Sequence, residues 1–393
     1  MKEKVVAMNK LKVMTVFGTR PEAVKMAPLV KALESDPDFD STVCVTAQHR
    51  QMLDQVLEIF EITPDYDLNI MQERQTLAGI TSKAMEGLYE VFLKAKPDIV
   101  LVHGDTTTTF AASLAAFYTQ TAIGHVEAGL RTFDKYAPYP EEANRRLTGV
   151  LADLHFAPTR ANRENLLREN VSDDTIYITG NTVIDALQKT IRGDYAFADG
   201  FLKNYAFGTK RVIAVTAHRR ENLGQPFENI FRALRNICEE FEDVELIYPV
   251  HLNPAVREAA GRFLSGHERI HLIEPLIVQD MHNLMARSYL IMTDSGGLQE
   301  EAPSLGKPVL VLRNETERPE AIAAGTVKLA GTGYESVYES AHLLLSDKGE
   351  YEKMSRAVNP YGDGRACARI LDALRFRYGM TKERPRAFGV GNG

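Results

Sequence analysis

SYLIMTDSGGLQEEAPSLGKP, residues 288–308, carries the clearest structural pattern in this chain. Tyr289 to Thr293 is an apolar run with the length of a buried parallel strand. It stops at Asp294-Ser295-Gly296-Gly297, where the glycines allow a tight turn and a close approach of the backbone to a ligand. A helix is expected next, and Gly306-Lys307-Pro308 ends it before a further strand, Val309 to Leu312. The pattern predicts a strand, turn, helix and strand of a parallel α/β sheet.

The first turn of this helix is a candidate anion site. Unpaired backbone N–H groups and the positive end of the helix dipole lie there, just past the carboxyl end of a strand. A phosphate suits the turn formed by Ser295, Gly296 and Gly297, and Glu301 places a carboxylate one turn further on, where it can accept hydrogen bonds from two sugar hydroxyls. The plainer alternative, which Ser-Gly-Gly alone favours, is an ordinary strand-to-helix turn with a serine N-cap and a surface glutamate.

The composition is that of an average globular protein of two domains. The 393 residues are too many for one ordinary core, and 44% are apolar while 25% are charged. A net charge of −7 without a basic block gives no reason to expect nucleic acid or an anionic membrane as a partner. Three scattered cysteines, with no CxxC and no histidine cluster, indicate neither disulfides nor a metal site, and no apolar run approaches a membrane span. These features predict a cytoplasmic protein.

The N-terminal part begins with another strand, turn and helix. Lys12 to Phe17 is a β-rich run, followed by Gly18-Thr19-Arg20-Pro21 and an amphipathic segment. No GxGxxG follows the strand, so a Rossmann-type nicotinamide or flavin site is not supported. Arg20 in the turn and Lys25 in the helix place two cations beside a helix N-terminus, which favours an anion, although ordinary surface bases explain them equally well.

Carboxylates follow neighbouring strands of the same series. The apolar run Asp98 to Val102 leads to Asp105, Ala122 to Val126 ends at Glu127, and Glu141 begins a helix after a proline-rich segment. Asp105 can instead cap the following helix, and Glu141 can pair with Arg145 for only about 0.3–0.5 kcal/mol. Such pairing does not explain why three carboxylates fall at neighbouring strand ends.

A second alternating series starts with Arg211 to Thr216, after a domain change placed near Gly180. His218 lies at a strand end beside two arginines, where a histidine is less easily explained as a core residue. Two successive β/α series predict two doubly wound domains that face each other across a cleft, because ligands of open α/β sheets bind outside the carboxyl ends of the strands. The second domain then holds the anion turn and the first holds the carboxylates.

Ten segments, in unbroken order from about Lys12 to Leu374, together resemble the non-hydrolysing UDP-N-acetylglucosamine 2-epimerases of bacteria. They are VFGTRPEAVKMAPL, TAQHRQMLDQVL, LVHGDTTTT, GHVEAGLRT, PYPEEANRR, ITGNTVIDAL, TAHRREN, PVHLNP, TDSGGLQEEAPSLGKPVLVLR and TERPEA. The resemblance implies a glycosyltransferase-B-type fold of two Rossmann-like domains, residues 1–179 with 366–393 and residues 180–365, in which the last helix returns to the first domain. It also implies a homodimer and the interconversion of UDP-GlcNAc and UDP-ManNAc without NAD or metal, which supplies ManNAc for a cell-surface polysaccharide.

The resemblance implies roles for individual residues as well. Those implied to hold the diphosphate and ribose of UDP are Ser295, Gly296, Gly297 and Glu301, with Arg20, Lys25 and His218 around the phosphates; His218 is grouped with the catalytic residues. Asp105, Glu127 and Glu141 match the acid/base carboxylates, and Arg145 matches a position near the sugar. The residues that match a second, activating UDP-GlcNAc site are Gln48, His49, Gln51, Arg74 and His251.

The implied chemistry is departure of UDP as a carboxylate removes the C2 proton. This gives 2-acetamidoglucal, to which UDP adds back while a proton reaches the opposite face of C2. Inversion needs acid/base groups on two faces, and a leaving diphosphate needs cations and helix dipoles. The sequence does not assign a carboxylate to either face.

Three other functions remain open. A UDP-sugar-dependent glycosyltransferase of the same fold needs an acceptor surface, often apolar and basic, which the sequence does not show. A hydrolysing epimerase releases free ManNAc, so it differs in whether UDP stays attached to the product. A non-catalytic UDP-sugar sensor has no use for three carboxylates together.

Overall fold

The computed structural model describes residues 10–47, 50–71 and 76–389 and divides the chain into two compact units. The first unit comprises Met1–Ala186 and Gly362–Gly393, and the second comprises Leu187–Tyr361. The divisions fall at 186/187 and 361/362, against expected boundaries of 179/180 and 365/366. The first division lies inside a helix, α7 (Thr182–Thr190), and not in the Gly180 turn before it.

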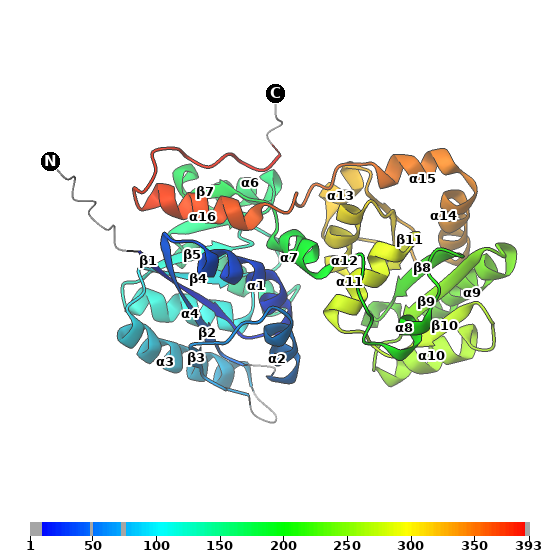
Figure 1. Ribbon diagram of the computed structural model, residues 1–393, viewed down its shortest axis with the longest axis horizontal. Coiled ribbons are helices and arrows are strands. Elements are labelled where there is room, and N and C mark those ends of the chain that lie inside the picture. The colour runs from blue at the N-terminus through cyan, green and yellow to red at the C-terminus, as the bar shows by residue number, and fades with distance from the viewer. Residues whose placement is uncertain (1–9, 48–49, 72–75, 390–393) are drawn as a thin grey trace. The chain divides into compact units, whose positions relative to one another are not determined.

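A parallel sheet of seven strands forms the centre of the first unit, in the order β3-β2-β1-β4-β5-β6-β7 (Figure 1). Its strands are β1 (Leu11–Phe17), β2 (Phe39–Val45), β3 (Tyr66–Asp67), β4 (Ile99–His103), β5 (Ala122–Val126), β6 (Leu154–Ala157) and β7 (Ile176–Ile178). Its other helices are α1 (Arg20–Ser35), α2 (Arg50–Ile59), α3 (Leu77–Ala95), α4 (Thr107–Tyr118), α5 (Glu141–Leu151), α6 (Arg160–Arg168) and α16 (Ala366–Arg377).

Alternate residues of the central strands point their apolar side chains to opposite faces of this sheet, and different helices cover the two faces. Met14 and Val16 of β1, with Val100 and Val102 of β4, pack against buried residues of α3 and α4. Because successive residues of a strand point to opposite faces, Val13 and Phe17 face the other way. There α1 packs against β1 and against α16. Burial on both faces explains why the central strands are almost continuously apolar.

The second unit repeats this plan with six parallel strands in the order β10-β9-β8-β11-β12-β13. These are β8 (Arg211–Thr216), β9 (Val244–Pro249), β10 (Ile270–Ile273), β11 (Leu290–Thr293), β12 (Val309–Val311) and β13 (Val327–Leu329). The helices are α8 (Gly200–Asn204), α9 (Gln225–Glu240), α10 (Pro254–Leu264), α11 (Val278–Arg287), α12 (Gly296–Glu301), α13 (Pro319–Ala323), α14 (Tyr334–Ser346) and α15 (Lys348–Ser355).

Two separate apolar clusters cover the two faces of this second sheet. Ile213 and Val215 pack with residues of α9, α10 and α14, while Val212 and Ala214 pack with residues of α11 and α12. Both units are therefore doubly wound parallel α/β structures, which confirms the predicted fold class. In each sheet the strand order reverses next to the first strand, between β1 and β4 and between β8 and β11. Such reversals open a crevice at the carboxyl ends of the strands, where ligands of this fold class bind.

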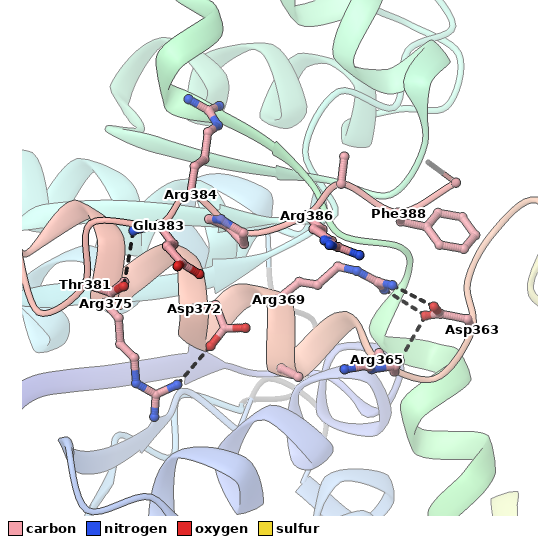
Figure 2. A pocket seen from close by; sticks show the side chains of 14 residues that line it. Asp363, Arg365, Arg369, Asp372, Arg375, Thr381, Glu383, Arg384, Arg386 and Phe388 are labelled. Carbon is pink, nitrogen blue, oxygen red and sulfur yellow. Dashed lines mark hydrogen bonds and ion pairs between the residues drawn. The ribbon is translucent and has the colours of Figure 1, made fainter. Parts of the chain in front are cut away.

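The C-terminal segment belongs to the first unit. Helix α16 packs against α1. The residues after it, up to Gly389, run back along α16 and β7, and Figure 2 shows Arg384, Arg386 and Phe388 of this tail next to Arg369 of the helix. The tail and α16 line a cavity of about 580 Å³. Most of its arginines are paired; Arg369, for example, forms two hydrogen bonds with the carboxylate of Asp363.

Candidate functional site

Asp105 lies at the strand-order reversal of the first unit, directly after β4. Its carboxylate Oδ2 is 2.9 Å from Nε and 2.6 Å from Nη2 of Arg145, and its backbone oxygen accepts a hydrogen bond of 2.9 Å from the Asn144 side chain. The alternative that Asp105 caps the next helix is wrong, because α4 starts at Thr107 and the Thr106 hydroxyl accepts the capping hydrogen bond from Thr109. Asp105 is therefore available for an ion pair with α5.

Arg145 does not form the ion pair with Glu141 that their spacing of four residues allows. It instead contacts Asp105 and, at 3.1 Å, Glu142. Glu142 is fully buried and also accepts hydrogen bonds from the backbone N–H groups of Thr132 and Phe133. Glu141 is half-buried and forms no hydrogen bond or ion pair within the part of the chain that the structure describes. Residue spacing alone did not indicate that Glu142, and not Glu141, would anchor this helix.

Glu127 follows β5, the neighbour of β4, and adopts a left-handed backbone conformation with φ of 62°. Few residues other than glycine take this conformation, and where they do they often belong to functional sites. The carboxylate contacts the Lys25 ammonium group and accepts a hydrogen bond of 2.8 Å from the Asn181 side chain. Burial acts to raise the pKa of Glu127, but the Lys25 charge, His103 and the hydrogen bonds from Lys25 and Asn181 together outweigh burial and hold the pKa well below its usual range. Glu127 is thus an ionised carboxylate at neutral pH.

His103, at the end of β4, was missed by the sequence reasoning. Its Nε2 atom lies 3.6 Å from Oε2 of Glu127. Burial lowers the pKa of His103 to about 4, so the ring is neutral at neutral pH. The structure therefore brings Lys25, His103 and Glu127 together, with Asp105 and Arg145 beside the same strand end. Arg20 is exposed at the start of α1 and makes no hydrogen bond or ion pair with the residues described.

Asp294 organises the strand-order reversal of the second unit. It is fully buried, and its Oδ2 atom accepts hydrogen bonds from the backbone N–H groups of His218 (2.7 Å) and Arg219 (2.8 Å) and from the Asn222 side chain (3.2 Å). Its Oδ1 atom lies 3.2 Å from Nδ1 of His218. Asp294 thus fixes the backbone of His218 at the end of β8, and one of its carboxylate oxygens faces the His218 ring.

The His218 ring also stacks on His251, with ring centroids 5.4 Å apart and planes inclined by 17°. Burial lowers the pKa of His218, and Asp294 opposes this shift while His251 adds to it. His251 therefore lies beside a residue expected at the phosphates. The other residues expected at an activating site cannot be placed. Gln48, His49 and Arg74 lie outside the described residues. Gln51 lies in α2, but its side chain is not among the described parts of the structure.

The Ser295-Gly296-Gly297 turn starts α12 as the sequence predicts, with Ser295 as N-cap. The glycines make room for a side chain of the protein as well as for any ligand. A Cβ atom on Gly296 would lie 3.0 Å from Cζ and Nη1 of Arg318, and Arg318 in turn pairs with Glu300 at 2.9 Å. The sequence reasoning missed Arg318, whose guanidinium group adds a positive charge at the turn.

Glu301 is not the surface glutamate of the plainer alternative. Its side chain is 15% exposed, and its Oε2 atom lies 3.3 Å from Nε2 of His282. The other ring nitrogen of His282 lies 2.6 Å from the Thr190 hydroxyl oxygen, which fixes the ring. Glu301 is thus held in place, as a hydrogen-bond acceptor for a ligand must be.

Two further features of the described residues bear on function. No group of three or more His, Cys, Asp or Glu side chains within them is arranged to hold a metal ion. Among the helices that the structure describes, none has the length and apolar character needed to cross a membrane.

Comparisons with known proteins give a consistent result. The family model of UDP-N-acetylglucosamine 2-epimerase matches residues 31–375. The UDP-N-acetylglucosamine 2-epimerase of Bacillus subtilis is 64% identical over 381 residues, which cover 97% of this chain and 99% of the relative. The crystal structure of a Listeria monocytogenes protein of the same description superposes with a TM-score of 0.91 at 59% identity and covers 97% of this chain and 100% of the other.

Two more structures extend the comparison to ligand and fold. The UDP-GlcNAc 2-epimerase of Neisseria meningitidis, solved bound to UDP-GlcNAc, superposes with a TM-score of 0.82 at 50% identity, covering 93% of this chain and 99% of the other. The glycotransferase of kitacinnamycin superposes with a TM-score of 0.62 at 11% identity, covering 93% and 99% of the two chains. This last likeness concerns the fold alone and confirms the predicted glycosyltransferase-like architecture.

Proposed function

The chain belongs to the UDP-N-acetylglucosamine 2-epimerase family and is an isomerase of UDP-GlcNAc, and we propose that it inverts C2 by eliminating UDP and adding it back. The product is UDP-ManNAc, a source of ManNAc for a cell-surface polysaccharide, and the intermediate is 2-acetamidoglucal. One observation carries this proposal. Asp105 and Glu127 follow adjacent strands at the strand-order reversal of the first unit, and each contacts a cation, Arg145 and Lys25 respectively.

The elimination route follows from the acidity of the substrate. C2 of N-acetylglucosamine is not next to a carbonyl group, so its proton leaves only as UDP departs from C1. Glu127 is ionised because its pKa is held low by Lys25, and it can accept a proton. Asp105 and Glu141 are the other candidates for proton transfer, since inversion requires proton transfer on two faces of C2. Acid and base roles among the three carboxylates are left open.

The second unit supplies the groups proposed for the departing nucleotide. The turn at Ser295, Gly296 and Gly297 offers backbone N–H groups, and Arg318 beside Gly296 adds a positive charge. His218, held by Asp294, is proposed to donate a hydrogen bond to the diphosphate, and Glu301 to accept hydrogen bonds from the ribose. Arg20 and Lys25 are proposed as further phosphate ligands; Lys25 can then both hold a phosphate and keep Glu127 ionised.

The proposal is tested by proton NMR of UDP-GlcNAc incubated with the protein in D2O without added NAD. UDP-ManNAc with deuterium at C2 is expected. Replacing Glu127 by Gln or Asp105 by Asn should lower kcat by roughly 10²- to 10⁴-fold, because each removes a group proposed to transfer a proton. Glu34→Gln serves as the control, since Glu34 is exposed on the surface of α1 and pairs there with Lys31. Full activity of the Glu127→Gln protein would remove Glu127 from the scheme.

The same experiment separates the other functions. A hydrolysing epimerase would give free ManNAc and UDP. A glycosyltransferase or a sensor would leave UDP-GlcNAc without deuterium at C2.

We further propose that UDP-GlcNAc activates the enzyme from a second site. What supports this is the position of His251, which stacks on His218 and can therefore transmit a change at one ring to the other. The rate should then depend sigmoidally on UDP-GlcNAc, and UDP-ManNAc alone should react hardly at all. Hyperbolic kinetics in both directions would contradict an activating site.

A homodimer is proposed on the basis of one exposed apolar surface of the first unit. Large apolar side chains are exposed on α3, α4 and α5, which pack in series: Leu93, Phe117, Tyr118, Leu147 and Val150. Large apolar side chains exposed on neighbouring helices are typical of interaction sites. A second copy of the chain is the partner that the family resemblance implies.

A further inference from the structure

Glu22 is a buried acid that the proposed mechanism does not use. It lies in the first turn of α1 and is 2% exposed. Its Oε2 atom accepts hydrogen bonds from the backbone N–H groups of Gly18 (3.1 Å) and Thr19 (2.8 Å). Its Oε1 atom lies 2.7 Å from the hydroxyl oxygen of Thr106 and 3.1 Å from that of Thr109. One carboxyl group thus contacts the turn after β1 and the turn after β4.

These two turns carry residues of the proposed site. The turn after β1 continues into Arg20, and the turn after β4 contains Asp105 between His103 and Thr106. The turns also pack directly on each other. A Cβ atom on Gly18 would lie 2.5 Å from the Thr108 hydroxyl oxygen, so only glycine fits there. A displacement of either turn would therefore displace the other turn as well.

Hydrogen bonds from both turns converge on the Glu22 carboxyl group. The Thr109 hydroxyl oxygen lies 3.1 Å from Glu22 and 2.5 Å from the backbone oxygen of His103, so Thr109 also ties Glu22 to the end of β4. Burial raises the pKa of Glu22, while the hydrogen bonds from Thr106, Gly18 and Thr19 act to lower it. The buried carboxyl group is therefore held by donors of both turns.

We propose that Glu22 is a positioning residue for the epimerisation: it holds the turn of Asp105 against the turn of Arg20 through Thr106 and Thr109. The role rests on the proposed function, because Glu22 acts through Asp105 and touches no substrate. It differs from an ordinary helix cap. A cap would need only the N–H groups of Gly18 and Thr19, whereas Glu22 also reaches residues more than eighty positions away.

Two substitutions at Glu22 give the first test. Glu22→Ala should lower kcat by about 100-fold, the size of effect expected when a reacting group is misplaced by about 1 Å. KM and the Kd of UDP should change by less than about tenfold, because Arg20 lies on the displaced turn but the proposed nucleotide groups of the second unit are untouched. Glu22→Gln should retain kcat within about fivefold, since the amide oxygen can accept the two backbone hydrogen bonds and the NH2 group can donate to the threonine hydroxyl oxygens. Glu34→Ala, on the surface of the same helix, should change none of these quantities.

A second pair keeps the test valid if the alanine variant does not fold. Thr109→Val removes the hydroxyl group and keeps the shape, so kcat should fall by about tenfold, whereas Thr109→Ser keeps the hydroxyl and should retain kcat. Melting temperatures of all variants are measured alongside. Loss of kcat in proportion to loss of folded protein, with Glu22→Gln as impaired as Glu22→Ala, would overturn the positioning role.

The combination with Asp105→Asn decides whether Glu22 acts through Asp105. A double variant should be hardly slower than Asp105→Asn alone, because residues that act as a unit are not additive. If the double variant instead lost kcat by the product of the two single-variant reductions, the proposal would be overturned. The proposed function fails separately, if the wild type places no deuterium at C2. If the wild type and Asp105→Asn behave as proposed but Glu22→Ala and Thr109→Val keep full kcat, only the positioning role fails.

Discussion

Asp294 shows how one buried carboxylate prepares a residue for its ligand. Three donors share its Oδ2 atom, and Oδ1 is left to face the His218 ring. A carboxylate facing Nδ1 favours a proton on that nitrogen and orients Nε2 of the same ring. The acid therefore sets both the direction and the tautomer of the proposed diphosphate ligand.

Replacing Asp294 by Asn should separate these effects. The amide oxygen can keep the three hydrogen bonds of Oδ2, so the melting temperature should change little. The amide NH2 group would instead face Nδ1 as a donor. Nδ1 would then have to accept, which requires the tautomer of His218 with its proton on Nε2. We expect the Kd of UDP, measured by calorimetry, to rise by about tenfold, which corresponds to about 1.4 kcal/mol. Asp294→Ala, which leaves three buried donors unpaired, should also lower stability by about 1–3 kcal/mol for each. Unchanged UDP affinity in Asp294→Asn would contradict this role of Asp294.

Residue spacing predicted the local parts of the site and missed its tertiary contacts. The turn at Ser295 follows from glycines and a strand end, and Glu127 and Asp105 from neighbouring strand ends. Arg145 was expected to pair within its own helix, yet its partner Asp105 lies 40 residues away in sequence. A pattern of nearby residues cannot show which distant carboxylate a buried arginine will meet. The contacts of Glu22 within its own turn could have been predicted, because Thr19 and Glu22 have the spacing of a capping box. Its contacts with Thr106 and Thr109 could not.

At the scale of elements, the chain-terminal tail protects the exposed edge of a sheet. Strand β7 ends the seven-stranded order, so its outer side has no neighbouring strand. Arg384 donates hydrogen bonds to the backbone oxygens of Asp173, Asp174 and Ile176, and the N–H group of Phe388 donates to the backbone oxygen of Ile178 (2.8 Å). The Arg384 guanidinium group also lies 4.7 Å from the Tyr177 ring centroid. The tail thus occupies backbone groups that another chain could otherwise pair with.

Ending the chain after Gly379 should therefore weaken the first unit and expose β7. Each lost hydrogen bond contributes about 0.5–1.5 kcal/mol, so a lower melting temperature is expected. Amide exchange should quicken over residues 176–178, and aggregation should grow with protein concentration. A chain shortened only by residues 390–393 is the control, and Arg384→Gln should give part of the effect. Equal exchange rates in the truncated and full-length chains would show that the tail does not protect this edge.

Element boundaries were predicted best where apolar runs are continuous. Strand β5 has the predicted limits. The β-rich run from Thr42 predicts a later start for β2 than the observed Phe39, because Asp40 and Ser41 interrupt the apolar signal. The apolar pattern from Phe110 likewise predicts a later start for α4 than the observed Thr107, because threonines are common at helix starts and give no apolar signal. Strand β6 and helix α6 were not predicted at all, since Leu154–Ala157 is short and contains a histidine.

At the scale of the whole molecule, buried histidines make stability depend on pH. Burial lowers the pKa of His125 from its ordinary 6.5 to about 3, and that of His103 and His155 to about 4. The folded protein keeps these rings neutral, while the unfolded chain binds a proton on each below about pH 6.5. Because the unfolded state then holds more protons, stability must fall as the pH is lowered from about 6.5 towards 4.

Denaturant unfolding at pH 7, 6 and 5 should show this fall, with a slope of up to about 1.4 kcal/mol per pH unit for each histidine. Replacing His125 by Asn removes one of these protons and should make the slope shallower, even though the loss of its 2.7 Å contact with the Gly104 oxygen lowers stability at pH 7. Parallel slopes for the wild type and the variant would contradict the assignment of His125 as a neutral buried group.

The proposed homodimer depends on whether the exposed apolar surface of α3, α4 and α5 is covered in solution. Val150 of α5 and Val358 of the second unit provide a matched pair, because they are 83% and 82% exposed. A glutamate at an interface must be desolvated on association, whereas on a free surface it stays in water. Val150→Glu should therefore shift sedimentation from dimer towards monomer, and Val358→Glu should leave it unchanged. A dimer that tolerates Val150→Glu would place the interface elsewhere, and a monomeric wild type would leave this surface without the partner proposed for it.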